Sequence, residues 1–259
     1  MKKILDYYFP DDEHHFSKTL SKSGQYQNPI RELAFEKVEN FNVSLDIGAN
    51  LGIFSRAFEN KFKKNYAIEP FAEHIKYLKL NAPNTTVFQY AISDVKTETT
   101  IKMQKEPFNE NCGMSKVSED GNIDVNCISL DLLHKKYNLP YADLIKMDVE
   151  YHELQVLQGG ENYIKSSWPV LIIEHTKNSP VEAFLKTWGY HTGKTLKIKH
   201  DNIYVKVDVE EVYVGSNSTL LPVTICDDVV IGAGSVVTKD ITEPGTYVGN
   251  PARKLEDQN

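Results

Sequence analysis

The sequence predicts an α/β fold, in which helices cover both faces of a mostly parallel sheet, followed by a short C-terminal segment of a different kind. Through the first 207 residues, short apolar strands alternate with helical patterns, as in a parallel sheet. Beyond residue 208, aliphatic residues recur at steps of six, five, six and six, which is typical of a left-handed parallel β-helix.

The elements of the sheet follow from the apolar runs and their flanking residues. Pro70 suits the start of a helix, and Gly159 and Gly160 suit the end of another. The expected strands lie at 43–48, 65–70, 86–93, 142–148, 169–175 and 202–207, with a weaker one at 99–103. The expected helices lie at 54–62, at 70–82, around Leu154 and Leu157, and at 181–190.

Length and charge limit the function classes. The chain has 259 residues, and its 41% hydrophobic and 25% charged residues are ordinary for a globular protein. A net charge of −7 argues against nucleic acid as a partner, and no apolar run is long enough for a membrane span or a signal peptide. The three cysteines are far apart, so we expect no disulfide framework and a cytoplasmic location.

Charge and sequence pattern both change near residue 208. The first 207 residues carry 27 acids and 26 bases, whereas the rest carries nine acids and three bases. We therefore expect an N-terminal helical or irregular segment at 1–40, an α/β domain at 41–207 and a β-helix-like tail at 208–259.

A glycine-rich stretch follows the first predicted strand. In LDIGANLGIFS, Gly48, Asn50 and Gly52 alternate after Asp46. Glycines at the carboxyl end of a strand allow a sharp turn and the close approach of a ligand, and asparagine also tolerates left-handed geometry. Glu69 ends the next strand, where a carboxylate can accept hydrogen bonds from both hydroxyls of a ribose. These residues together predict a nucleoside site.

The spacing of this loop distinguishes between cofactors. A dinucleotide-binding loop has the spacing G-x-G-x-x-G. Here the pattern is D-x-G-x-N-x-G, the form found in proteins that bind S-adenosylmethionine (SAM). We therefore expect SAM, with Ala91 and Ser93 after the third strand shaping the adenine pocket. A nicotinamide cofactor and a tight turn without a ligand are the alternatives.

Several separated motifs resemble those of the FkbM family of SAM-dependent methyltransferases, over about residues 25–207. They are SLDIGANLGIFS, AIEPFAEH, QYAISD, NCGMS, DLIKMDVEYHELQVLQGG and PVLIIEH. The resemblance implies a class I methyltransferase fold, a doubly wound, Rossmann-like sheet of seven strands with one antiparallel strand. It also implies O-methylation, often of sugars. The family usually has glycine after DVE, where this chain has Tyr151, so we expect a reshaped acceptor pocket.

The candidate catalytic residues follow the fourth and fifth main strands. Methyl transfer to a hydroxyl needs an in-line donor and acceptor and a group that takes the proton. Asp148 is the first candidate for contact with the methionine end or the acceptor, and Glu174 is expected to face it. His175 and His152 are candidate bases because imidazole titrates near neutrality, and Glu150 completes the set. Solvated or structural histidines are the alternative.

The sequence predicts the roles of other polar residues near these strands less specifically. The carboxylates and His175 suit a divalent cation by ligand type, but their spacing fits no defined motif, so we expect no metal. Lys146 lies within a predicted strand and is expected to pair with an acid such as Glu174. The remaining histidines are expected to be ordinary core or surface residues: His14, His15, His74, His134, His191 and His200.

The tail resembles the C-terminal end of the hexapeptide-repeat acyltransferases, through ICDDVVIGAGSVVTKDI and GTYVGNPARKL. That resemblance implies trimers with CoA between subunits and a histidine base, but no histidine follows His200. With about two coils of 18 residues, the tail is too short for an independent solenoid. We expect it to be catalytically inactive, to pack on the larger domain and to form at most a weak homo-oligomer. The expected buried column is Val214, Leu220, Ile225, Ile231 and Val237.

The sequence thus predicts a SAM-dependent O-methyltransferase that acts on a hydroxyl of a sugar, a glycan or a glycosylated small molecule. Two alternatives stay open. One is a bifunctional or acyl-transferring enzyme that binds CoA at its tail. The other is a non-catalytic SAM-binding assembly module, which would bind the cofactor without transferring its methyl group.

Overall fold

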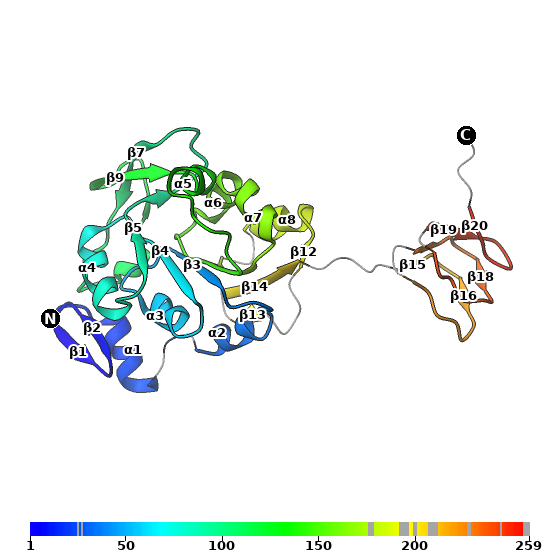
Figure 1. The fold of residues 1–259 in the computed structure, drawn as a ribbon, viewed down its shortest axis with the longest axis horizontal. Coiled ribbons are helices and arrows are strands. Elements are labelled where there is room, and N and C mark those ends of the chain that lie inside the picture. The colour runs from blue at the N-terminus through cyan, green and yellow to red at the C-terminus, as the bar shows by residue number, and fades with distance from the viewer. Residues whose placement is uncertain are drawn as a thin grey trace. The chain divides into compact units, whose positions relative to one another are not determined.

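The chain forms two compact units, Met1–Lys206 and Val207–Asn259, each with its own hydrophobic core (Figure 1). The computed structural model describes residues 1–24, 26, 28–175, 179–191, 197–198, 201–206, 212–226, 229–243 and 245–255. Over these ranges, no helix combines the length and the apolar character that crossing a membrane requires.

The first unit is built on one large sheet. Across it the strands are β12 (Tyr190–His191), β14 (Asp201–Lys206), β11 (Val170–Glu174), β10 (Leu144–Met147), β3 (Val43–Ile47), β4 (Lys64–Ile68) and β5 (Thr86–Phe88). Strands β11, β10, β3, β4 and β5 run parallel, and β14 is antiparallel to β11. The expected seven-stranded sheet with one antiparallel strand is therefore confirmed, and β13 (Lys197–Ile198) is an additional strand paired with β14.

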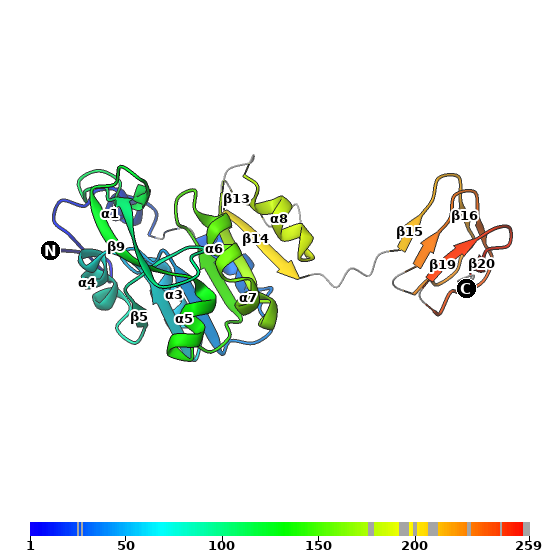
Figure 2. The ribbon, with the colours of Figure 1, turned by 90° about the horizontal axis from the view of Figure 1, so that it is seen from above.

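Helices cover both faces of this sheet, as Figure 1 shows. One face carries α5 (Leu130–Tyr137), α6 (Glu153–Gly159), α7 (Glu161–Ser167) and α8 (Val181–Thr187), which are labelled in the view from above in Figure 2. The other carries α2 (Asn28–Phe35), α3 (Ile53–Glu59) and α4 (Ala72–Asn81). Strand β10 explains the arrangement, because Ile145 and Met147 join one core cluster and Leu144 joins the other. Apart from Lys146, the strand is apolar throughout, as expected for a strand that is buried on both faces.

The third predicted strand, 86–93, is divided between two sheets. Its first part is β5 in the large sheet, and its second part is β6 (Ala91–Ile92) in a smaller one. That smaller sheet has the order β6, β9 (Ile123–Ile128), β7 (Thr99–Gln104) and β8 (Lys116–Val117). Strand β9 escaped prediction because Asp124 and Asn126, residues that are rare in strands, alternate with the buried Val125 and Cys127.

The N-terminal segment packs within the same unit. It forms a hairpin of β1 (Lys2–Ile4) and β2 (Tyr7–Phe9), followed by α1 (His15–Ser23). The carboxylate of Glu13 accepts hydrogen bonds from the backbone N–H groups of Phe16 at 2.6 Å and Ser17 at 3.0 Å, which satisfies the start of α1. Phe16 then packs in one cluster with Leu51 of the glycine-rich loop. The first helix thus lies beside the predicted cofactor loop.

The second unit is a parallel coil with three sides. It consists of β15 (Val212–Val214), β16 (Thr219–Leu220), β17 (Val229–Ile231), β18 (Val236–Val237), β19 (Gly245–Val248) and β20 (Arg253–Lys254). Val212 pairs with Val229, and Val229 with Gly245, so successive coils are offset by 17 and 16 residues. Strands β16 and β18 form the second side, and an Ile225–Ile241 bridge marks the third.

The expected aliphatic column of this unit is only partly correct. Ile231 and Val237 are buried, together with Val229 and Ile241. The prediction was wrong for Val214 and Leu220, whose exposed fractions are 47% and 43%. Both residues belong to the first coil, whose β15 and β16 each pair on one side only among the described residues. An aliphatic side chain is covered only where another coil lies on it.

Candidate active site

The glycine-rich loop lies where the strand order of the large sheet reverses, between β3 and β10. Gly48 has a φ of +76°, and its hypothetical Cβ would lie 2.0 Å from the carbonyl oxygen of Asp148. No other residue fits there. Asn50 is also left-handed, with a φ of 47°. A Cβ at Gly52 would lie 3.0 Å from the Cα of Leu78 in α4, so this glycine allows close packing rather than ligand contact.

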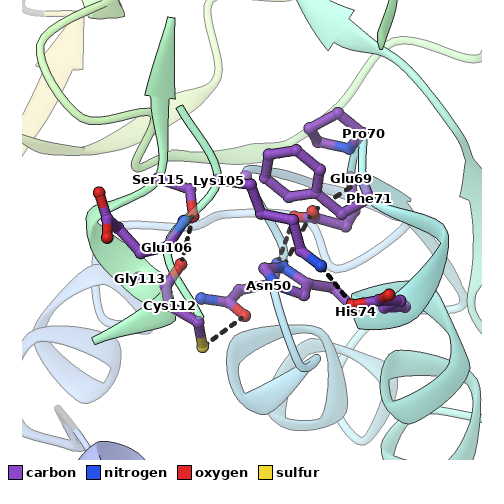
Figure 3. A network of polar contacts seen from close by, with 12 residues as sticks. Asn50, Glu69, Pro70, Phe71, His74, Lys105, Glu106, Cys112, Gly113 and Ser115 are labelled. Carbon is purple, nitrogen blue, oxygen red and sulfur yellow. Dashed lines mark hydrogen bonds and ion pairs between the residues drawn. The ribbon is translucent and has the colours of Figure 1, made fainter. Parts of the chain in front are cut away.

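Glu69 is held at the end of β4 by three groups (Figure 3). Its carboxylate accepts hydrogen bonds from the backbone N–H of Asn50 at 2.9 Å and of Phe71 at 3.1 Å. The Nδ1 atom of His74 lies 3.2 Å from the same carboxylate. A carboxylate has about four acceptor sites, so Glu69 keeps capacity for hydroxyl groups in the cavity that it lines.

This first cavity has the composition of a nucleoside pocket. Gly48, Asn50 and Glu69 line its polar end. Apolar side chains line the rest, as a flat aromatic base requires: Ile47, Ile68, Pro70, Phe71, Ala91, Ile92, Met103 and Val117. Ser93 is buried just outside the lining, and its hydroxyl lies 2.8 Å from Nε2 of His152, which does line the cavity. The types of residue that line this cavity, whose volume is about 60 Å³, therefore suit the adenosine part of SAM.

A loop from the smaller sheet closes this cavity. The backbone N–H of Glu106 donates to the Ser115 hydroxyl, which in turn donates to the carbonyl of Cys112, both at 2.9 Å (Figure 3). The Cys112 thiol contacts the side-chain oxygen of Asn50 at 3.8 Å. Burial raises the pKa of this thiol to about 12, so it is not a nucleophile near neutral pH.

Lys146, in β10, contacts one carboxylate within the sheet and one at its edge. Its ammonium group lies 3.7 Å from Asp46 and 3.1 Å from Asp148. Burial by itself lowers the pKa of Lys146, but the charges of Asp148 and Asp46 outweigh that effect and raise it. Asp46 lines none of the three cavities described here, and it also accepts a 2.6 Å hydrogen bond from the Ser55 hydroxyl. In this structure Asp46 thus contacts Lys146 and Ser55, and its expected role in cofactor binding stays a prediction.

Asp148 connects the first cavity with two others. A second cavity extends from Gly48 toward α1, and a third, of about 540 Å³, opens over the ends of β10 and β11. Asp148 lines all three, and Glu150 and Glu174 line the last two. As expected from the strand register, Asp148 and Glu174 both border one space. The third cavity falls within the range of small-molecule sites, about 300–1,000 Å³.

The third cavity is strongly acidic. Burial first, and then the charges of Asp148 and Glu174, raise the pKa of Glu150 to about 8. Burial also raises the pKa of Glu153 to about 7. No group of three His, Cys, Asp or Glu side chains in the described ranges has a geometry suited to a metal ion. The raised pKa values mean that Glu150 and Glu153 hold their protons to higher pH than ordinary carboxyl groups.

The two candidate histidine bases lie in different places. His175 lines the third cavity, and its Nε2 lies 2.6 Å from the Tyr204 hydroxyl. His152 lines the first cavity instead, beside Ser93. Burial lowers the pKa of His152, which favours the neutral imidazole. The structure thus places His152 at the first cavity, apart from His175, because the turn after β10 directs it toward Ser93.

Sequence reasoning missed His74, which was expected to be an ordinary residue. Its ring is 1% exposed, lines the first cavity and contacts Glu69 through Nδ1. Its Nε2 is buried without a hydrogen-bond partner among the described residues. The available signal was the spacing: Pro70 stands just before α4, whose first turn brings His74 back to Glu69.

The strand order and the site define a class I methyltransferase architecture. The sequence profile of the Methyltransferase FkbM domain matches residues 46–192, more than half of the chain. The chain belongs to this family. A second profile, the hexapeptide repeat of succinyl-transferase, matches residues 210–239 in the tail.

Individual proteins are similar to parts of this chain. A hexuronic acid methyltransferase, AglP of Haloferax volcanii, is 32% identical over 158 residues, which cover 60% of this chain and 64% of that protein. A methyltransferase FkbM structure from Methylobacillus flagellatus covers 63% of this chain and 43% of its own, at 17% identity and a TM-score of 0.41. The structure of a magnesium protoporphyrin IX methyltransferase of Synechocystis with bound SAM covers 76% of this chain and 87% of its own, at 12% identity and a TM-score of 0.43.

Proposed function

We propose that this protein transfers a methyl group from SAM to a hydroxyl of a sugar, in a glycan or a glycosylated small molecule. The observation that carries the proposal is the junction at Asp148, which joins a nucleoside-like cavity to a wide acidic one. The FkbM family membership and the hexuronic acid methyltransferase of Haloferax volcanii support the same class of reaction.

On the donor side, Glu69 is proposed to accept hydrogen bonds from the ribose, and Gly48 and Asn50 to approach the rest of the cofactor. Ala91 is proposed to line the adenine pocket, and Ser93 to hold His152 at its edge. When bound, SAM supplies a methyl group on a positively charged sulfur. The acidic surroundings of Asp148 suit that positive charge.

On the acceptor side, Asp148 and Glu174 are proposed to orient the reacting hydroxyl, and Glu150 to take its proton. A pKa of about 8 makes Glu150 a stronger base than an ordinary carboxylate, and it borders both acceptor-side cavities. His175 is the second candidate, but its Nε2 lies against Tyr204 at 2.6 Å. No step of this scheme uses a metal ion.

The charge of the third cavity bears on which sugar is accepted. The carboxylates in its lining are Asp148, Glu150, Glu153 and Glu174. Lys146, which pairs with Asp46 and Asp148, offsets only part of this charge. Lys116, whose ammonium lies 5.9 Å from the ring centre of Tyr151, adds a positive charge beside the cavity. Like charges repel strongly in partly buried sites, so we propose that neutral and amino sugars are better acceptors than uronic acids.

The proposal is tested by incubating the protein with SAM and a saccharide library that includes the methyl glycosides of glucose, glucosamine and glucuronic acid. We expect release of S-adenosylhomocysteine together with a product that is heavier by one methylene group. Among the three glycosides, the glucuronide should react most slowly. SAM binding without methyl transfer to any saccharide would contradict the proposal and favour the non-catalytic module.

A further inference from the structure

Tyr151 lies at the acceptor-side cavity in a backbone conformation that tyrosine rarely adopts. Its φ is 72°, and the preceding Glu150 has a φ of 49°. In this left-handed region the Cβ atom crowds the carbonyl oxygen, and glycine alone enters it without cost. Two such residues in a row need contacts on both sides to persist.

Those contacts come from the residues around Tyr151. The Val149 backbone N–H donates to the Glu153 carboxylate at 3.3 Å, which closes the turn before α6. His152 follows Tyr151 directly and contacts Ser93 at 2.8 Å. The side chain of Tyr151, by contrast, is 67% exposed. The chain therefore keeps a strained tyrosine without burying its ring, so core packing does not explain the residue.

The third cavity, to which this ring belongs, has one polar wall and one apolar wall. The polar wall consists of the carboxylates described above. The apolar side chains that line it with Tyr151 are Met114, Leu154, Pro180 and Val181. A pyranose has the same two-sided character, because its hydroxyl groups point outward from the ring edge while its faces carry C–H bonds. An aromatic ring offers a rigid apolar surface for such a face.

We propose that Tyr151 is the platform on which a pyranose ring of the acceptor stacks, and that it thereby helps to select the acceptor. This inference rests on the proposed function, since it assigns an acceptor-binding role to one residue of the same site. The left-handed turn presents the ring to the cavity, and the neighbouring carboxylates receive the hydroxyl groups of the stacked sugar.

A purely structural role for Tyr151 makes a different prediction. Lys116 lies over the ring at 5.9 Å from its centre, which makes a cation–π contact at an exposed site. If the ring served only that contact, its removal would lower stability and leave sugar binding unchanged. If it is a platform, replacement by glycine should relieve backbone strain and weaken sugar binding.

Saturation-transfer NMR separates these roles. The intact protein, saturated with S-adenosylhomocysteine, is mixed in turn with the methyl glycosides of glucose, glucosamine and glucuronic acid. We expect transfer to the ring protons of at least one glycoside. Tyr151→Gly should weaken that glycoside's affinity roughly five- to tenfold, whereas Tyr151→Phe should stay within about twofold. A matched control is Leu5→Gly, which removes another exposed left-handed side chain with a φ of 53° in the N-terminal hairpin.

The melting temperature supplies the second readout. Tyr151→Gly and Leu5→Gly should melt no lower than the wild type and up to about 4 °C higher. No transfer to any glycoside in the wild type, or unchanged transfer in Tyr151→Gly, would overturn the inference, and so would a clearly lower melting temperature of that variant. Because NMR reports binding and not turnover, sugar binding without methyl transfer would contradict the proposed function alone.

Discussion

The two sides of the site are built in different ways. On the cofactor side, Glu69 is 3% exposed and its carboxylate is fixed by two backbone N–H groups and His74. On the acceptor side, Tyr151 and Met114 are 67% and 41% exposed, and burial raises the pKa values of Glu150 and Glu153. The cofactor side is thus pre-organised by the backbone, whereas the acceptor side depends on side chains in loops.

This difference suggests how the fold divides its tasks. A cofactor of fixed structure can be held by glycines and backbone groups at the ends of strands, where little variation is tolerated. An acceptor is selected by exposed side chains, which change without disturbing the core. Substitutions on the cofactor side should therefore affect SAM binding, and those on the acceptor side should affect turnover and acceptor choice.

The largest effect should come from Gly48→Ala. The new Cβ would lie 2.0 Å from the carbonyl oxygen of Asp148, and the φ of +76° adds strain. We expect SAM affinity to fall by at least about 100-fold, measured by calorimetry. Gly24→Ala is the matched control, because it has a φ of +70° but no atom within 4 Å of the new Cβ. Equal SAM binding by both variants would refute the close contact at Gly48.

Glu69→Ala should have the next largest effect. Loss of two charge-assisted hydrogen bonds to the ribose costs roughly 3 kcal/mol, so SAM affinity should drop on the order of 100-fold. Glu73→Ala is the control, since this exposed carboxylate lies in α4 and pairs with Lys105. Calorimetry should show near-normal SAM affinity for the control. An unchanged affinity in Glu69→Ala would remove Glu69 from the cofactor site.

On the acceptor side, Glu150→Gln should reduce turnover about 100-fold, because general-base catalysis contributes factors of about 10²–10⁴. SAM affinity should stay within about threefold. Asp148→Asn should also reduce turnover, whereas His175→Ala should have a smaller effect if its contact with Tyr204 is structural. Initial rates of S-adenosylhomocysteine release test the series. Full activity of Glu150→Gln, with a large loss in His175→Ala, would make His175 the base.

The same carboxyl groups predict a pH dependence of stability. The pKa of an ordinary glutamate is 4.5, but Glu150 and Glu153 keep their protons in the folded state up to about 8 and about 7. At a pH between 4.5 and these raised pKa values, the folded state binds more protons than the unfolded state. The free energy of unfolding should therefore fall as pH rises from about 5 to about 8. Urea denaturation at several pH values should show that the free energy of unfolding of Glu150→Gln depends less on pH than that of the wild type. A stability that rises over this range in the wild type and is unaffected by that change would contradict the assignment.

The smallest effects on SAM binding should come from the tail and from metal removal. Every side chain proposed to contact the cofactor precedes residue 207, so deletion of 207–259 should change SAM affinity by less than about twofold. Light scattering of the intact chain should show at most weak self-association, and EDTA should not change activity. A tight trimer lost on truncation would assign the tail an assembly role, and magnesium-dependent activity would establish a metal site.

How much the sequence predicts depends on whether a signal is local. Asp46, Gly48 and Glu69 are recognisable because the loop and the strand ends stand at fixed spacings. Cys112 was not assigned to the site, since it meets Asn50 across 62 residues of sequence. His74 was missed although it stands only five residues after Glu69, because its burial and ring orientation are not visible in the sequence. Glu150 and Tyr151 are visible as residues, but their left-handed conformations are not. Likewise, period-six spacing predicts the coils of the tail but not that the first coil leaves Val214 uncovered.

The identity of the cofactor is tested by calorimetric titration of the intact protein with SAM, and with NAD⁺ and acetyl-CoA alongside. We expect one SAM per chain, bound with a Kd in the micromolar range, about −8 kcal/mol. We also expect no measurable heat from either of the other compounds. Absence of SAM binding, or tighter binding of NAD⁺ than of SAM, would contradict the assignment of the loop at Gly48 and of Glu69 to SAM.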